Sequence, residues 1–166
     1  MILSNSNLLA SPTNETINSD IQSYGSQLKV KYKSNILSLP ICTSNESVAV
    51  LRKIWDDDLL NIQEQVYVLF LNGYNQVICY RCLNTGTSKQ TLFDIKLAMA
   101  CALGCLAMKV IIAHNHPTGL LRPSPGDIAI TEQLKAACSL MDIHLIDHII
   151  INRYDYFSFK DNRIVF

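Results

Sequence analysis

The sequence predicts a single α/β domain in which helices flank a mixed β-sheet. Two apolar runs joined by Asn72-Gly73-Tyr74-Asn75 have the pattern of a β-hairpin. Helical patterns then alternate with buried strands over residues 94–152. A length of 166 residues and a hydrophobic fraction of 49% are sufficient for one core. From residue 62 onward we therefore expect the order β-β-α-β-α-β-β.

The N-terminal part differs in composition from the rest. Residues 1–27 are rich in Ser, Asn, Thr and Gln, and such a segment buries too little surface to offset the cost of ordering. We expect a flexible polar tail at 1–27, an extended lead-in at 28–43 and the folded domain at 44–166.

Two elements are expected before the hairpin. The segment LKVKYKS at residues 28–34 alternates in polarity as a strand does. A short helix follows, with Ser44 or Asn45 as its N-cap. Its apolar positions recur at helical spacing: Val48, Leu51, Ile54 and Trp55.

Periodicity predicts the elements that follow the hairpin. Residues 94–109 are apolar on nearly every side, as in a helix packed between layers. Residues 110–114 have the pattern of a buried strand. After a polar loop, residues 127–142 form an amphipathic helix, 143–152 a strand and 154–166 a closing hairpin-like segment.

Charge, cysteine content and the length of the apolar runs limit the partners and the cellular compartment that we expect. Fourteen basic residues balance fourteen acidic ones, so the composition lacks the basic excess that is typical of DNA-binding proteins. The N-terminus does not resemble a secretory signal, and we expect the six cysteines to be reduced thiols in the cytoplasm. The longest uncharged apolar run, 97–108, is shorter than the roughly 20 residues of a membrane helix, so no membrane partner is expected.

The stretch AHNHPTGLLRPSPGD, residues 113–127, carries a candidate metal site. His114 and His116 lie two residues apart on a strand and point to one face, while Asn115 points to the other. Asp127, at the start of the next helix, can turn back toward both histidines. Two histidines and one aspartate leave the fourth tetrahedral position of zinc for water, which is the arrangement of a catalytic site.

Other interpretations of this stretch stay open. Ser124, Pro125 and Asp127 also match the N-cap, N1 and N3 positions of a capping box, and capping can coexist with metal binding. The two histidines can equally be loop-edge side chains satisfied by hydrogen bonds. An HNH nuclease is excluded, because in that class the three letters name residues spread along a ββα unit.

A water-activating zinc site needs a general base. Glu64 shares a predicted strand face with Ile62, Val66, Val68 and Phe70, which is an unusual place for a carboxylate without a partner. The alternative is a charge at the exposed end of the strand.

Together these residues resemble a known motif. Glu64, His114-x-His116-Pro117 and Ser124-x-x-Asp127 are similar to the JAMM motif of the JAB/MPN metalloprotease superfamily. The segments AHNHPTGLLRPSPGDIAITEQL and IDHIII are similar to RadC-like proteins, often called DNA repair protein RadC. The resemblance runs from about Ser44 to Phe159 and implies an MPN-type α/β fold with one zinc ion per chain.

The resemblance also implies a role for each matching residue. His114, His116 and Asp127 would hold zinc, Glu64 would act as general acid/base, and Ser124 would stabilise the oxyanion. Zinc lowers the pKa of its water to about 7, so that a carboxylate can take the proton as the water attacks a carbonyl. The implied reaction is hydrolysis of a peptide or isopeptide amide, with a protein or peptide as the substrate.

The sequence departs from the family pattern in places. Thr118 stands where the family often has Ser, and Lys96 where it often has Arg; neither is a proposed ligand. Longer relatives carry an N-terminal helix-hairpin-helix DNA-binding region, which the polar N-terminus does not resemble. The alternatives to peptide hydrolysis are a non-catalytic binding module in DNA maintenance and hydrolysis of a non-peptide bond.

Three further features are interpreted as mainly structural. Cys79 and Cys82 lie three residues apart on a predicted strand and so face opposite sides, and no second pair accompanies them. Cys101 and Cys105 share a helix face and are expected in the core. His148, in IDHIII, is either a hydrogen-bonded structural histidine, or a residue that supports a metal ligand or faces the substrate.

Overall fold

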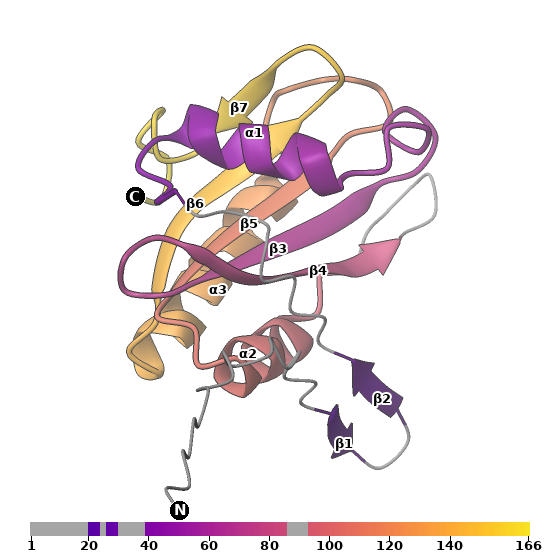
Figure 1. Cartoon of the computed structure of the whole chain (residues 1–166). Helices are drawn as coiled ribbons and strands as arrows, with labels where there is room; N and C mark the ends of the chain where they lie inside the picture. Colours follow the sequence, from indigo (N-terminus) through magenta and orange to yellow (C-terminus); the bar gives the residue numbers. More distant parts are fainter. Residues whose placement is uncertain (1–19, 24–25, 30–38, 86–92) are drawn as a thin grey trace, which may run out of the picture.

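The structure, a computed structural model, describes residues 20–23, 26–29, 39–85 and 93–166 (Figure 1). The predicted single α/β domain is confirmed as a five-stranded mixed sheet with helices on both faces. The strand order is β4-β3-β5-β6-β7. These strands are β3 (Gln65–Leu71), β4 (Val77–Thr85), β5 (Lys109–Asn115), β6 (His144–Ile151) and β7 (Tyr156–Ser158).

The helices are α1 (Ser44–Ile54), α2 (Ile95–Gly104) and α3 (Pro125–Leu140), and the predicted order β-β-α-β-α-β-β is confirmed. Helix α2 ends before the predicted residue 109, because the chain turns at Leu106 (φ 53°) to enter β5. Among the described residues, no helix is both long and apolar enough to cross a membrane.

The N-cap of α1 is Thr43, so the prediction of Ser44 or Asn45 is wrong by one or two residues. The Thr43 hydroxyl accepts a hydrogen bond from the Glu46 backbone N–H (3.2 Å), and the Glu46 carboxylate accepts one from the Thr43 N–H (2.9 Å). This reciprocal capping box satisfies two N–H groups that the helix itself cannot pair, and the Ser44 hydroxyl is used elsewhere.

A separate two-stranded sheet precedes the domain. Strands β1 (Asp20–Ser23) and β2 (Ser26–Lys29) pair in antiparallel fashion. The predicted strand at 28–34 overlaps the end of β2, and its residues 30–34 lie outside the described residues. Most of the predicted tail also lies outside them, and the boundaries at 27 and 43 stay predictions.

Strand β5 lies in the middle of the main sheet. It pairs in antiparallel fashion with β3, with Val66 opposite His114, and in parallel with β6, with Ile150 opposite His114. The predicted turn at residues 72–75 joins β3 to β4, and Asn75 adopts a positive φ of 62° there. The Asn72 side chain stabilises this turn by accepting the backbone N–H of Tyr74.

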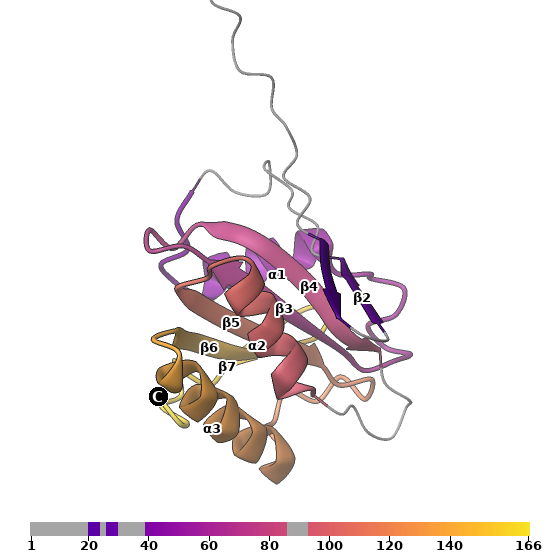
Figure 2. The same cartoon turned by 90° about the horizontal axis from the view of Figure 1, so that it is seen from below.

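The two faces of the sheet carry two separate cores, because side chains alternate along each strand. Helices α2 and α3 cover one face and α1 covers the other (Figure 2). The predicted core positions Cys101 and Cys105 lie in the α2–α3 core. Cys79 lies in that core while Cys82 packs against the α1 core, so the two face opposite sides as predicted.

A buried carboxylate joins α1 to β6 and β7. Asp147, 1% exposed, accepts hydrogen bonds from the hydroxyls of Ser44 (2.9 Å) and Ser158 (2.7 Å). It also accepts the backbone N–H groups of His148 (2.7 Å) and Lys160 (3.1 Å). Burial raises the pKa of the Asp147 carboxyl, while these four hydrogen bonds act in the opposite direction.

Replacing Asp147 with Leu should destabilise the fold by about 3 kcal/mol, because the buried N–H of His148, the partly buried N–H of Lys160 and two serine hydroxyls lose their acceptor. Asp147→Asn keeps an oxygen for both N–H groups and can donate to the two serine hydroxyls. Its free energy of unfolding should stay within about 1 kcal/mol of the wild-type value. Urea unfolding measures both variants, and equal destabilisation would contradict the network.

The wild type and Asp147→Asn together test whether the pKa of the Asp147 carboxyl is raised in the folded protein. A raised pKa means that the folded state favours the protonated acid, so this contribution to stability is complete below the ordinary Asp pKa. It is lost as the pH rises through the folded-state pKa. The wild type should therefore lose stability relative to Asp147→Asn as the pH is raised through that window.

Candidate metal centre

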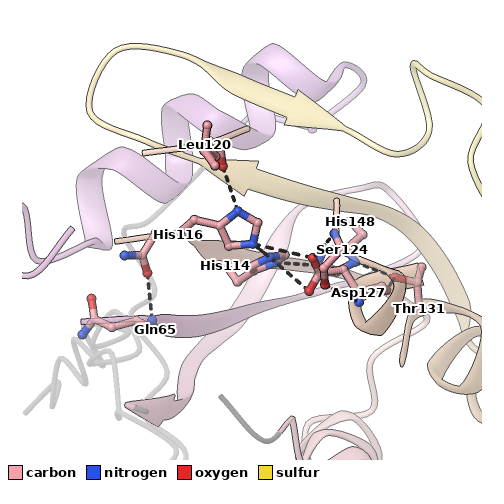
Figure 3. Close-up of polar contacts among 9 residues, drawn as sticks. Gln65, His114, His116, Leu120, Ser124, Asp127, Thr131 and His148 are labelled. Carbon is pink, nitrogen blue, oxygen red and sulfur yellow. Dashed lines mark hydrogen bonds and ion pairs between the residues drawn. The ribbon is translucent and has the colours of Figure 1, made fainter. Parts of the chain in front are cut away.

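Three ligand-type side chains converge where β5 ends and α3 begins (Figure 3). The His114 Nε2 and His116 Nε2 atoms are 2.9 Å apart. Asp127 Oδ1 lies 3.4 Å from His114 Nε2, and Asp127 Oδ2 lies 3.6 Å from His116 Nε2. Ligands at about 2.0–2.1 Å from a tetrahedral zinc ion are about 3.3 Å from one another, and the two carboxylate–imidazole distances lie close to that spacing, while the Nε2–Nε2 distance is shorter.

The His116 ring is oriented by the loop that follows it. Its Nδ1 donates to the Leu120 carbonyl oxygen (2.8 Å), and a carbonyl can only accept, so Nδ1 carries the proton and Nε2 keeps its lone pair. The loop turns back through Gly119, whose φ of 75° favours glycine. The Asn152 amide donates to the Gly119 carbonyl (2.9 Å) and holds the loop against the end of β6.

The start of α3 places Asp127. Ser124 is the N-cap, its hydroxyl accepts the Asp127 N–H (3.2 Å), and Asp127 Oδ2 accepts the Ser124 N–H (2.7 Å). The capping interpretation is therefore confirmed, and the same carboxylate keeps Oδ1 directed at His114. Capping and a metal-facing position coexist in one residue.

Asp127 and His116 shift each other's protonation. Burial would raise the pKa of the Asp127 carboxyl, but its contacts with the rings of His114 and His116 outweigh this effect and hold that pKa well below its ordinary value. The contact with Asp127 raises the pKa of His116 against the effect of burial. The group of three side chains thus attracts positive charge to the space between them.

His114 is supported by a second histidine. Its Nδ1 lies 2.8 Å from Nε2 of His148, which is 1% exposed and stacks on Phe159 at a centroid distance of 4.4 Å. The His148 Nδ1 lies 2.6 Å from the Thr131 hydroxyl oxygen. Burial, and secondly the charge of His114, hold the pKa of His148 well below its ordinary value.

The contacts favour the interpretation of His148 as a supporting residue, because its ring lies directly behind that of His114. Sequence reasoning missed its partner Thr131. The available signal was the helical i, i+4 spacing from Asp127, which puts Thr131 on the same face of α3.

Glu64 lies just before β3, which begins at Gln65. The predicted strand face shared with Ile62 is therefore not formed, because Ile62 lies in a turn and is exposed. The β3–β5 register nevertheless pairs Val66 with His114, so the chain at Glu64 runs beside His116. The negative charge of Glu64 is among the influences that raise the pKa of His116.

Asn115 points away from the histidines, as predicted, and clamps the segment that carries Glu64. It is fully buried, and its Oδ1 accepts the Gln65 backbone N–H (2.7 Å). Its amide donates to the carbonyls of Leu60 (2.6 Å) and Gln63 (2.9 Å). The middle residue of His-Asn-His thus fixes the Glu64 segment to the strand that carries the histidines, a role that sequence reasoning missed.

The donor set fits a divalent cation. The Leu120 carbonyl takes the Nδ1 proton of His116, so the Nε2 lone pair of His116 faces His114 Nε2 and the Asp127 carboxylate. Such a group of acceptors is repulsive unless a cation or an extra proton lies among them. Two imidazoles and a carboxylate are a ligand set that suits catalytic zinc.

Comparison with known proteins agrees with this geometry, since the RadC-like JAB domain family matches residues 41–164. The chain belongs to the RadC-like JAB domain family. The resemblance to RadC-like proteins is thereby confirmed, and the five-stranded mixed sheet with three helices is consistent with an MPN-like fold.

The RadC-like domain has relatives among curated proteins. It is 40% identical to a UPF0758 protein of Flavobacterium johnsoniae over 101 residues, which are 61% of this chain and 44% of that protein. It is 39% identical to one of Porphyromonas gingivalis over 62% of this chain and 46% of the relative. For one of Streptococcus suis the identity is 35%, over 60% and 40%. The matched region thus spans less than half of these relatives, whose names state no activity.

Purified without added metal, the protein should carry about one zinc ion per chain, as three protein ligands imply. Asp127→Asn should weaken zinc binding strongly, because the amide replaces a charged ligand. Ser124→Ala should cost about 1 kcal/mol of stability as a lost cap and leave zinc content unchanged. Metal analysis measures these three proteins and a His114→Ala, His116→Ala double variant, in which undiminished zinc would contradict the site.

Asn115→Ala should loosen the Glu64 segment, because the Gln65 N–H and the Leu60 and Gln63 carbonyls lose their hydrogen bonds to the Asn115 side chain. Amide hydrogen exchange should rise at residues 60–65, while zinc content should change little, since the side chain points away from the metal centre. Asn72→Ala is the matched control, because it removes an asparagine that stabilises the turn at the other end of β3. Equal exchange at residues 60–65 in Asn115→Ala and the wild type would contradict the clamp.

Proposed function

We propose that this RadC-like domain is a zinc-dependent hydrolase that cleaves a peptide or isopeptide amide. The observation that carries the proposal is the convergence of the Nε2 atoms of His114 and His116 and the Asp127 carboxylate, with the Nδ1 proton of His116 taken up by a backbone carbonyl. The match to a JAB domain supports the same reaction class. A protein or peptide substrate and a cytoplasmic location are parts of the proposal.

The metal ligands are His114, His116 and Asp127. Zinc held by them would lower the pKa of a coordinated water to about 7 and polarise a substrate carbonyl. The strand β5 and the N-terminus of α3 are packed elements of the fold, so these side chains are held in place before substrate arrives.

Glu64 is the proposed general base and acid. Its carboxylate takes a proton from the attacking water and delivers it to the leaving amine nitrogen. Its half-buried place beside the end of β5, next to His116, supports this role. The Asn115 clamp positions the backbone from which it projects.

Ser124 is the proposed oxyanion donor. Its oxygen accepts the Asp127 N–H, which leaves the hydroxyl proton available to donate. The side chain is exposed at the start of α3, where a substrate carbonyl can approach it. There the hydroxyl donates to the carbonyl oxygen as negative charge develops on it.

The DNA-maintenance alternative has less support. The chain has equal numbers of basic and acidic residues, whereas phosphate contacts require a concentration of Lys and Arg. We therefore favour an amide substrate over a nucleic acid. Salt-sensitive binding to branched or single-stranded DNA in a gel-shift assay would reverse that preference.

Glu64→Gln should lower kcat about 10²- to 10⁴-fold, because the amide cannot take a proton from water. Its zinc content should equal that of the wild type. Turnover is measured on parallel panels of peptide, isopeptide and nucleic-acid substrates. Glu132→Gln, the same change at an exposed position of α3, is the matched control and should leave turnover unchanged.

Full turnover in Glu64→Gln would show that another group is the base. Cleavage confined to the nucleic-acid panel would contradict the substrate class while leaving the metal centre intact.

A further inference from the structure

We propose that Thr131 and His148 are positioning residues that hold His114 in its metal-binding tautomer. They do so through a chain of hydrogen bonds whose direction is set by the backbone carbonyl of Asp127. The role of these hydrogen bonds in metal binding rests on the proposed zinc function. Its hydrogen-bond direction follows from the contacts alone and can be tested without metal.

The first link is between Thr131 and the backbone of its own helix. The Thr131 hydroxyl donates to the Asp127 carbonyl oxygen, one helical turn earlier. A carbonyl oxygen cannot donate, and a hydroxyl has a single proton, so that proton is committed. The contact of 2.6 Å between the same hydroxyl and His148 must therefore use an oxygen lone pair.

The second link follows from the first. His148 Nδ1 has to donate to Thr131, so the proton of the neutral imidazole lies on Nδ1. Its Nε2 then carries a lone pair and accepts from His114 Nδ1 across 2.8 Å. The opposite tautomer of His148 would need a second hydroxyl proton from Thr131, which does not exist.

The third link is His114, the proposed metal ligand. With its proton on Nδ1, His114 presents a lone pair at Nε2, the atom that faces Asp127 Oδ1 and His116. His116 reaches the same tautomer independently, because its Nδ1 donates to the Leu120 carbonyl. Each ligand histidine thus has its own acceptor, one a backbone carbonyl and the other a buried imidazole.

The series of hydrogen bonds begins and ends at Asp127. The carboxylate of Asp127 is a proposed ligand, and the carbonyl of the same residue sets the direction of the hydrogen bonds that orient His114. Helix α3 therefore supplies both a ligand and the orientation of another. Residues behind metal ligands commonly affect metal affinity about 10- to 100-fold in this way.

Removal of the Thr131 hydroxyl should reverse the direction of the hydrogen bond between His148 and His114. In Thr131→Val, His148 loses the acceptor for its Nδ1 proton, and its Nε2–H tautomer becomes favourable. That tautomer donates to His114 Nδ1 and leaves the His114 proton on Nε2, where zinc has to displace it. Thr131→Ser keeps the hydroxyl and should keep the wild-type direction.

Two measurements on the full chain test the proposal. Long-range ¹H–¹⁵N NMR of the imidazole groups reports which nitrogen of His148 carries the proton, with and without zinc. Competition with a chelator gives the dissociation constant for zinc. Ser47→Ala is the matched control, because Ser47 is also buried and also donates to a carbonyl one turn earlier, in α1, without touching a histidine.

We expect His148 of the metal-free wild type to be protonated on Nδ1. Thr131→Val should shift it toward Nε2 protonation and weaken zinc binding about 10- to 100-fold, while Thr131→Ser and Ser47→Ala keep the wild-type values. A His148 that is protonated on Nε2 in the wild type would overturn the proposal. Equal zinc affinity in Thr131→Val and Thr131→Ser would overturn it too.

The two proposals fail in different ways. A wild-type protein that binds no zinc would end the proposed function, while the tautomer of His148 in the metal-free protein would still decide the direction of the chain. The NMR measurement on the wild type needs no variant, so a substitution that prevents folding does not block the test.

Discussion

The pairing of β5 with β3 on one side and β6 on the other is the constraint on which the site depends. Its register places Val66 and Ile150 beside His114, and so brings the Glu64 segment to one side of the histidine and β6, which carries His148, to the other. A shift of one residue would turn Asn115 into the site and His114 away from it, since alternate residues face opposite sides. No contact within the site can compensate for such a shift.

The same alternation gives β6 two different roles. Asp147 faces α1 and gathers hydroxyl and N–H donors there, whereas its neighbour His148 faces α3 and contacts Thr131. Each polar group is buried, so each requires partners held at fixed positions. The strand is thereby attached to a helix on each face, and the position of His148 behind His114 depends on both attachments.

Local patterns were enough to predict that His114, His116 and Asp127 come together. The spacing of His114 and His116, and the match of Ser124 to Asp127 as a capping box, involve residues close in sequence whose geometry is set by strand and helix alone. The turn at residues 72–75 was predictable for the same reason. These features depend on backbone periodicity, which a sequence displays directly.

Contacts between distant segments were not predictable. Thr131 and His148 meet only because α3 packs on β6, and the Asn115 clamp joins residues fifty positions apart. The N-cap of α1 was misplaced because Thr43 and Ser44 are locally equivalent. Their difference arises from the tertiary structure, in which the Ser44 hydroxyl is bound by Asp147. Glu64 was assigned to a strand that begins one residue later, since a strand boundary depends on its neighbours.

The positions of the imidazole protons explain why lone pairs face one another between His114, His116 and Asp127. The Leu120 carbonyl holds the Nδ1 proton of His116 behind the ring, and in the proposed hydrogen-bond chain His148 does the same for His114. The centre is then rich in lone pairs, and without a cation this is an unfavourable arrangement that the sheet and helices have to support. A cation that binds only the folded chain relieves this repulsion, so its binding free energy adds to the stability of the fold. The same rigidity that makes the centre costly without a cation holds His114, His116 and Asp127 close enough together that they could bind a metal ion.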